Sequence, residues 1–263
     1  VAPGSAGLAE DSSPDSAKRS VPSAQSGAAE DRELELEADA MEAAEAVGSG
    51  LSDKEQLELD VEANMLKHQA VQDTFPISLG DFMRLFVEDN APFGFAKFHL
   101  EKGDVAVEAT EWKESLAAIG FSRELRFIKP LAFSIGPNKT RALKVQRYKR
   151  FGDEGLVLCS STSLEDIPSG DAFSVEDRMF VRATGPRECS VDMRMQVKFV
   201  KGTILKRIID TTTTSETIKW LQDYTSAAKA FGERHTAGEG GAPAEPHGDA
   251  PAAGTDASAA GAA

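Results

Sequence analysis

The 263-residue chain has two cysteines and four histidines, and they are scattered along it. Cys159 and Cys189 lack the CxxC spacing of a zinc site or a redox pair. His99 has no metal-ligand pattern beside it, and we expect it within a strand, in a packing or surface role. We find no nucleophile elbow, phosphate-binding loop or HExxH motif. Catalytic groups can converge from distant strands, but the sequence favours a binding protein, not an enzyme, with no metal and no cofactor.

The two cysteines fall in segments with strand character, where a small buried thiol is the ordinary role of this residue. We therefore expect two free core cysteines. The sequence gives no reason to place the chain in an oxidising compartment.

Charge divides the chain into three parts. Residues 1–70 carry 16 acidic and 5 basic side chains, residues 71–230 carry 22 and 23, and residues 231–263 carry 5 and 1. The acidity belongs to the flanks and argues against nucleic-acid binding by them. No apolar run approaches the ~20 residues that span a bilayer, and no signal-peptide pattern opens the chain. Because the first residue is Val1, we expect a fragment of a longer protein.

Composition divides the chain into four expected segments: a disordered acidic, Ala-rich flank (1–50), a possible acidic helix (51–70), a folded domain (71–232) and a disordered tail (233–263). Ser52 and Glu55 form a capping-box pattern at the start of the acidic helix. Leu57 and Val61 recur at helical spacing. We expect this helix to be solvated without fixed docking, and a partner-binding helix is the alternative.

Periodicity in the middle segment predicts a helix, about seven strands and a long final helix. Phe82, Leu85 and Phe86 give the first helix one apolar face. The clearest strand runs from Cys189 to Val200, where apolar and polar residues alternate. The expected strands cover residues 96–101, 104–110, 123–129, 140–148, 155–162, 173–181 and 189–200.

The final helix is expected to start near Ile204. Its Thr211–Ser215 run either loosens the helix or ends it, with Ser215 capping a new one. The strand connections are too short for parallel crossovers. We therefore predict an α+β fold, a curved antiparallel sheet with helices on one side. Such a sheet curled around a long helix leaves an interior that holds a ligand or is filled by side chains.

Several segments, in order from Phe75 to Phe231, resemble the VASt family of StAR-related lipid-transfer-like domains, found in GRAM/VASt sterol-transfer proteins. Asp166-Ile167-Pro168-Ser169-Gly170-Asp171-Ala172-Phe173 is similar to its DVP-(Tyr/Phe)-x-x-x-Phe stretch, although Ser169 stands where an aromatic residue is usual. Residues 138–146 resemble its x-x-T-A-x-T-x-x-Q strand. The other similar segments are Phe75 with Phe82 and Phe86, Trp112 with residues 123–127, and residues 189–206.

The resemblance implies a helix-grip, StART-like fold in which a curved antiparallel sheet packs on a long C-terminal helix and encloses a hydrophobic cavity. It also implies non-enzymatic binding of a sterol or similar lipid and its transfer between membranes, at the cytosolic face and at endoplasmic reticulum contact sites. The fragment itself is expected to be soluble. The alternative is a protein-interaction module on the same fold without lipid cargo. The oligomeric state is left open.

The loop over residues 130–137 is the first candidate site. Two prolines and a glycine argue against a regular strand, yet the loop carries Leu131, Phe133 and Ile135. Exposed apolar loop residues often mark a ligand or membrane contact, and in the family the corresponding loop lies at the cavity mouth. The alternative is that these residues pack into the core.

The inner face of the sheet is expected to supply the cavity wall, and methionine suits an irregular ring system because it adapts its shape. Plain core packing is the alternative. The candidate wall residues are Phe127, Val145, Leu158, Met179, Met193, Met195 and Val197. A basic cluster follows the loop, formed by Lys139, Arg141, Lys144, Arg147, Lys149 and Arg150. Its members, Lys139 and Arg141 first, either attract anionic lipid headgroups or form a solvated strand face.

Overall fold

The computed structural model of the chain describes residues 50–115, 120–131 and 137–239. The predicted flank before residue 50 and most of the predicted tail lie outside the described residues. The elements are α2 (Asp53–Ala63), β1 (His68–Phe75), α3 (Leu79–Phe82), the π-helical turn η1 (Met83–Val87), α4 (Phe95–Glu101), β2 (Val105–Ala109), β3 (Lys113–Ser115), β4 (Gly120–Pro130), β5 (Lys139–Phe151), β6 (Gly155–Leu164), the 3₁₀ turn η3 (Gly170–Ala172), β7 (Phe173–Gly185), β8 (Glu188–Phe199) and α5 (Lys206–Glu239).

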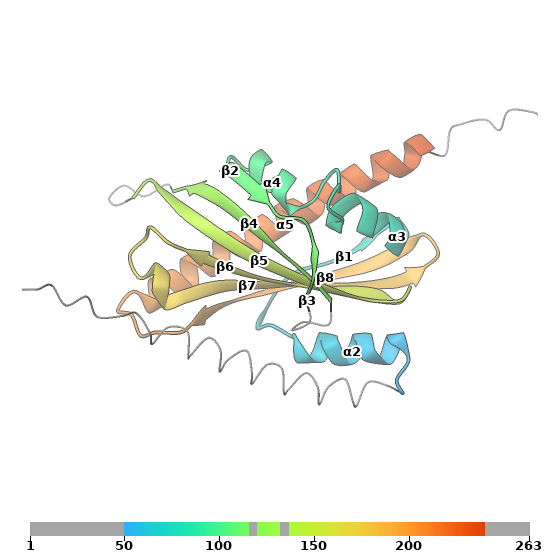
Figure 1. Cartoon of the computed structure of the whole chain (residues 1–263), viewed down its shortest axis with the longest axis horizontal. Helices are drawn as coiled ribbons and strands as arrows, with labels where there is room; N and C mark the ends of the chain where they lie inside the picture. Colours follow the sequence, from blue (N-terminus) through green and yellow to red (C-terminus); the bar gives the residue numbers. More distant parts are fainter. Residues whose placement is uncertain (1–49, 116–119, 132–136, 240–263) are drawn as a thin grey trace, which may run out of the picture. The chain divides into compact units, whose positions relative to one another are not determined.

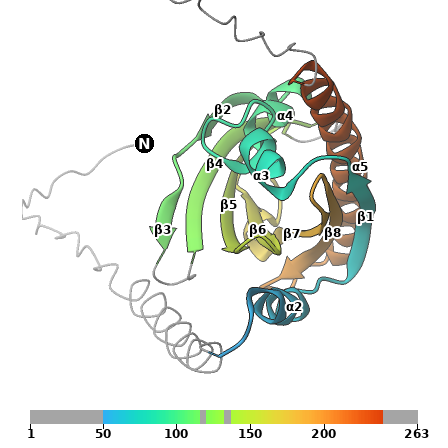
Figure 2. The same ribbon diagram turned by 90° about the vertical axis from the view of Figure 1, so that its right-hand side faces the viewer.

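The strands form one antiparallel sheet that curves around α5 (Figures 1 and 2). The order is β1-β8-β7-β6-β5-β4-β2, and the short β3 also pairs with β4. β1 is the edge strand beside β8, and β2 is the strand at the opposite edge. The predicted α+β fold, a curved antiparallel sheet on a long C-terminal helix, is confirmed.

Alternation along β8 decides which face of the sheet is inside. Cys189, Val191 and Met193 are fully buried toward α5, whereas the intervening Ser190 and Asp192 are half-buried on the outer face. A strand with one apolar row must bury that row. The inner face of β8 is therefore apolar, as the sequence predicts.

The predicted strand over residues 96–101 is wrong, because this segment forms helix α4. Gly94 takes an extended conformation at the N-cap. Phe95, Phe98 and His99 then follow at the i, i+3, i+4 spacing of one helical face, and all three are buried. His99 is therefore a helical residue in the interior, not a strand residue.

Helix α2 is present with the predicted capping box at Ser52, but the expectation that it is merely solvated is wrong. Leu57 and Val61 pack on the outer face of the sheet in a separate cluster with Phe151, Val157 and Phe180. Figure 1 draws α2 on one side of the sheet and α3 and α4 on the other. Helices therefore cover both faces, contrary to the one-sided arrangement that the sequence suggested.

Helix α5 is continuous over 34 residues, about 51 Å at 1.5 Å per residue. The threonine run neither ends it nor starts a new helix at Ser215. The Thr211 hydroxyl donates to the Arg207 carbonyl at 2.9 Å, a bond that an α-helix accommodates. In the described part of the chain, no helix is long and apolar enough to cross a membrane.

Candidate ligand-binding cavity

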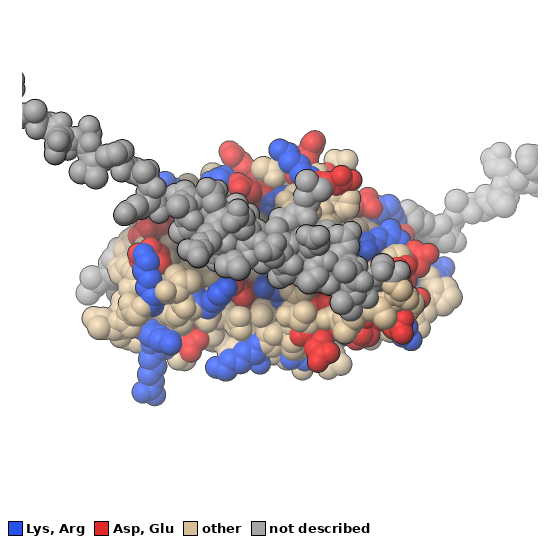
Figure 3. Space-filling model, turned by 60° about the horizontal axis from the view of Figure 1, so that its bottom comes forward, with Lys and Arg blue, Asp and Glu red and all other residues tan. Residues whose placement is uncertain are grey.

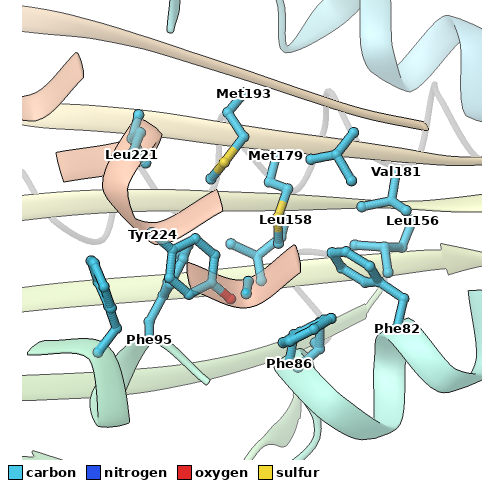
Figure 4. Packing of buried hydrophobic residues seen from close by; sticks show 14 of the residues in the cluster. Phe82, Phe86, Phe95, Leu156, Leu158, Met179, Val181, Met193, Leu221 and Tyr224 are labelled. Carbon is cyan, nitrogen blue, oxygen red and sulfur yellow. The ribbon is translucent and has the colours of Figure 1, made fainter. Parts of the chain in front are cut away.

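The space between the sheet and α5 has two halves, and aromatic side chains fill one of them (Figure 4). Phe82 and Phe86 point from α3 and η1 toward the sheet, with ring centroids 4.9 Å apart in an edge-to-face arrangement. They meet Leu158 and Met179 from the sheet, and Tyr224 from α5 lies in the same cluster. We call this region the packed half, and it forms the core of the domain.

The other half holds a cavity of about 400 Å³, which we call the hollow half. On the sheet side its walls are largely apolar, with Phe127, Leu164 and Val175 among them. On the helix side Thr212, Thr213 and Thr217 line it. These short side chains leave a gap where longer ones would reach the sheet. The remaining lining residues are His99, Lys129, Leu131, Pro137, Lys144, Thr162, Ile167, Pro168, Phe173, Asp177, Leu205, Ile208, Ile209, Glu216, Trp220 and Leu221.

The cavity reaches the surface where α5 begins. Ile208 lines the cavity and is 65% exposed, and the nearby Ile204 is 101% exposed. Val200, at the end of β8, is 63% exposed. We call Val200, Ile204 and Ile208 the apolar rim. Large exposed aliphatic side chains beside an opening are the pattern expected of a membrane or ligand contact.

Basic side chains stand beside the apolar rim. Lys201 forms an exposed ion pair with Asp171 at 2.8 Å, and Lys206 lies over the Phe199 ring at 5.1 Å. On the face in Figure 3, Lys and Arg side chains project from the left end, with acidic side chains beside some of them. Figure 1 places the start of α5 at that same end.

The segment that resembles the family motif builds one edge of this opening. Ser169 adopts a left-handed conformation with φ of 63°, and its hydroxyl lies 2.9 Å from the Thr203 hydroxyl, just before α5. A Cβ at Gly170 would lie 2.3 Å from the Leu164 carbonyl oxygen, so this position requires glycine. The turn thereby holds Ile167 and Pro168 against the cavity.

The hollow half also contains buried charge, which the sequence reasoning missed. Lys144 and Asp177 form an ion pair of 2.8 Å and are 7% and 2% exposed. His99 Nδ1 lies 2.7 Å from Asp104 Oδ2. Burial lowers the pKa of His99, and the neighbouring Lys144 charge lowers it further, although Asp104 opposes the shift. The two-residue alternation of the strand could have indicated that Lys144 is buried, because it puts Lys144 on the same face as Ala142.

The predicted wall residues separate into different regions. Phe127 and Leu131 line the cavity. Val145 is wrong as a wall residue, because it lies on the outer face of β5, opposite Lys144. Phe133 and Ile135 lie outside the described residues. The others belong to the core cluster rather than the lining: Leu158, Met179, Met193, Met195 and, partly buried, Val197.

The predicted basic cluster does not form one surface. Lys139 and Arg141 are exposed at the start of β5, two and four residues after the lining residue Pro137. The Arg141 guanidinium donates two hydrogen bonds to Asp166, at 2.9 and 2.8 Å, and this lowers the pKa of the Asp166 carboxyl to about 2. Its charge is therefore largely offset. Arg150 pairs with Asp153 in the β5–β6 turn.

Both cysteines are free, and burial raises the pKa of Cys189 to about 12. This thiol therefore stays protonated and packs as a small apolar group. Within the described residues, no group of three or more His, Cys, Asp or Glu side chains could hold a metal ion.

Comparisons with known proteins place these features in context. The sequence model of one family, described as VASt, VAD1 Analog of StAR-related lipid transfer domain, matches residues 69–216. The protein VASCULAR ASSOCIATED DEATH 1, chloroplastic, of Arabidopsis thaliana is 27% identical over 142 residues, which cover 52% of this chain and 24% of that protein. The chain thus spans about a quarter of this relative.

Solved structures show a more distant likeness. Norcoclaurine synthase from Thalictrum flavum, in complex with dopamine and hydroxybenzaldehyde, is 15% identical, with a TM-score of 0.38 over 63% of this chain and 85% of that one. A point mutant of the same enzyme with a transition state analogue gives a TM-score of 0.39 over 63% and 93%, also at 15% identity.

Proposed function

The chain belongs to the VASt family, and from this premise we propose that it binds a sterol or a similar lipid in the hollow half and carries it between membranes without altering it chemically. The family description links the domain to lipid transfer. The proposal adds the class of lipid, the membrane step and the absence of catalysis.

The observation that carries the proposal is the position of the cavity. About 400 Å³ of space lies behind largely apolar walls and reaches the surface next to an exposed apolar rim. Burying apolar surface is worth roughly 25 cal/mol per Å². A lipid that enters this space therefore loses much of the cost of crossing water. A protein that used its fold only as a scaffold would have no use for this empty interior.

The apolar rim is proposed to touch the bilayer while the lipid moves. Burial of Ile204 and Ile208 in the lipid interface lowers the free energy of membrane binding. Lys206 stands beside them and favours anionic headgroups, by about 1 kcal/mol for a well-placed charge. The charge of the neighbouring Lys201 is offset by Asp171. Lys139 and the partly neutralised Arg141 lie on the facing strand. We propose that the opening docks on an anionic membrane surface.

The membranes served are proposed to be those at endoplasmic reticulum contact sites, reached from the cytosolic face, as the family resemblance implies. The Arabidopsis relative carries the word chloroplastic in its name. A fluorescently tagged chain tests the proposal by co-localisation with markers of both organelles. Accumulation at chloroplasts without any endoplasmic reticulum signal contradicts it.

Transfer of a fluorescent sterol between two liposome populations tests the main proposal. The double substitution Ile204→Asp with Ile208→Asp should slow transfer at least tenfold, because it places two charges where the bilayer is met. Equilibrium binding of the same sterol, delivered in a soluble complex, should change little. The matched control is Leu59→Asp, which alters a 52% exposed residue on α2 and should transfer normally.

The interaction-module alternative gives a different result in the same assay. If the wild-type chain shows no saturable binding of any sterol or other lipid, the carrier proposal is wrong. If it binds lipid but both the rim variant and the Leu59 variant transfer at the wild-type rate, membrane docking through the rim is wrong while lipid binding stands.

A further inference from the structure

A second depression lies on the other side of α5 from the cavity. It is a surface groove of about 660 Å³ between α5 and the start of β1, two elements that Figure 2 draws side by side. No described residue lines both this groove and the cavity. We call it the outer groove. Its polar lining includes Lys67, His68, Asp210, Thr211, Thr214 and Ser215.

The threonine run of α5 divides between the two spaces. Thr212 and Thr213 line the cavity. Thr211, Thr214 and Ser215 line the outer groove. With 3.6 residues per turn, neighbouring positions of a helix point to different sides. The run therefore places hydroxyl groups in the outer groove as well as short side chains beside the cavity.

One of these hydroxyls has no hydrogen-bond partner among the described residues. The Thr211 and Thr225 hydroxyls each donate to the carbonyl four residues earlier, at 2.9 and 2.8 Å, which is an ordinary arrangement in a helix. Thr214 Oγ1 is buried and makes no such bond. Leaving a buried hydroxyl unsatisfied is unfavourable, and a group bound in the outer groove can supply the missing partner.

The charges of the outer groove are arranged on two walls. Lys67 is exposed, forms no ion pair with a described residue, and stands next to the half-buried His68. Across from them on α5, Asp210 is the only carboxylate among the described lining residues. Lys219, also in the lining, is held by Asp223 at 2.9 Å. The β1 wall is therefore basic, and the α5 wall offers hydroxyl groups and one acceptor.

The outer groove extends toward the apolar rim. Gln222 closes one end, because its side-chain amide donates to a carbonyl of β1 at 3.2 Å. The other end, at Asp210, lies two residues after the rim residue Ile208. At 1.5 Å per residue, Ser215 is about 11 Å along α5 from Ile208. The headgroup layer on each side of a bilayer is about 5–7 Å thick. When the rim enters the apolar layer with α5 upright, the open end of the outer groove therefore lies among headgroups.

We infer that the outer groove binds the phosphate group of a membrane lipid that is not the transferred cargo. Lys67 and His68 donate to the phosphate from one wall, and the Thr214 hydroxyl donates from the other. Asp210 accepts from a hydroxyl or ammonium group of the same headgroup. The inference rests on the proposed function, because the contact of the rim with the bilayer brings the groove to the headgroups. A dissolved phosphate ester offers the same chemistry.

Vesicle binding tests the inference. Vesicles of phosphatidylcholine and phosphatidylglycerol present phosphate together with hydroxyl donors, and vesicles of phosphatidylcholine alone lack an O–H or N–H donor in the headgroup. The wild-type chain should bind the mixed vesicles more tightly. Lys67→Gln and Thr214→Val should each weaken this binding about fivefold, through loss of one charge or one hydrogen bond.

Two variants outside the outer groove serve as matched controls. Lys113→Gln removes an exposed lysine on β3, and Thr74→Val removes an exposed hydroxyl on the outer face of β1. Both should bind the mixed vesicles as the wild type does. If Lys67→Gln loses no more affinity than Lys113→Gln, or if Thr214→Val binds as the wild type does, the inference is wrong and the vesicles are met by general charge alone.

Glycerol 3-phosphate distinguishes the two sources of the phosphate. It is added to the mixed vesicles as a competitor, with sodium chloride at matched ionic strength as the control for screening. Displacement of the wild-type chain shows that the outer groove also takes dissolved phosphate esters. Binding that resists the competitor, but is weakened by both groove variants, shows that the groove takes only a phosphate anchored in the bilayer.

Sterol binding keeps this test apart from the test of the proposed function. A fluorescent sterol delivered in a soluble complex should bind both groove variants as it binds the wild type, because the outer groove and the cavity share no described lining residue. If sterol binds and the groove variants retain full vesicle affinity, the carrier proposal stands and the groove assignment fails. If no sterol binds but the variants lose vesicle affinity, the carrier proposal fails and the groove assignment stands.

Discussion

The packed half and the hollow half of the interior are built from the same strands with the same alternation, yet only one is full. In the packed half, Phe82 and Phe86 reach in from α3 and η1, and Tyr224 reaches in from α5. In the hollow half α5 presents Thr212, Thr213 and Thr217 beside larger apolar side chains, and His99 lines the cavity from α4. The elements that cover the sheet therefore differ between the two halves. The sheet differs as well, since Lys144, Thr162 and Asp177 line the hollow half.

The largest difference between the halves should appear in stability. Leu158 and Leu164 lie on the same face of β6, the first in the core cluster and the second in the cavity lining. Leu158→Ala should lower the free energy of unfolding by about 3–5 kcal/mol, because it creates a void in a packed region. Leu164→Ala should cost about 1 kcal/mol, since space already adjoins it. Urea denaturation measures both, and equal losses would contradict the division into two halves.

A second prediction concerns the charge inside the hollow half. Lys144→Met leaves Asp177 buried without its partner and should cost about 3 kcal/mol. Lys144→Met with Asp177→Leu removes both charges and should recover most of that loss. Denaturation of the two variants and the wild type gives the comparison. A double variant as unstable as the single one would mean that the pair itself, and not the orphaned carboxylate, stabilises the fold.

Filling the cavity should affect binding more than folding. Thr213→Trp places a large ring in the hollow half and should weaken sterol affinity at least tenfold, about 1.4 kcal/mol. Thr211→Trp, on the exposed side of the same helical turn, should bind as the wild type does. Fluorescent-sterol titration measures both. Equal affinity of the two variants would show that the ligand lies elsewhere.

The smallest effect should be a pH dependence that arises from His99 in the hollow half. The pKa of His99 in the folded chain lies below its ordinary value of 6.5, so the unfolded chain takes up this proton first as the pH falls. The contribution of neutral His99 to the free energy of unfolding is fully present above pH 6.5. It is lost as the pH falls toward the folded pKa, with a slope of at most about 1.4 kcal/mol per pH unit. Thermal melts between pH 7 and pH 5 measure it. His99→Gln should flatten this part of the profile, and an unchanged slope would assign it to other groups.

The sequence predicts the sheet far better than the cavity. Alternation over β8 identifies the inner face, because burying every second side chain gives the sequence a hydrophobic pattern with a period of two residues. The same alternation cannot distinguish Met179, which packs, from Phe127, which lines the cavity. That difference depends on what stands opposite each residue. Val145 was assigned to the wrong face because apolar character outweighed the period that it shares with Leu143.

The buried charge of the hollow half was missed for a related physical reason. Lys144 sits between arginines and lysines in sequence, so its charge is read as part of a surface cluster. Only its pairing with Asp177, a residue far along the chain, makes burial tolerable. His99 was assigned to a strand because residues 96–101 are short and apolar, although the spacing of Phe95, Phe98 and His99 already has the helical period.

The docking of α2 bears on where this domain can be cut. The family match starts at residue 69, but Leu57 and Val61 cover Phe151, Val157 and Phe180 on the back of the sheet. A truncated chain that starts at residue 69 would expose an apolar patch over the three adjoining strands β5, β6 and β7. Such a truncated chain should self-associate and express poorly, whereas one that begins at Ser52 keeps α2 over the outer face of the sheet.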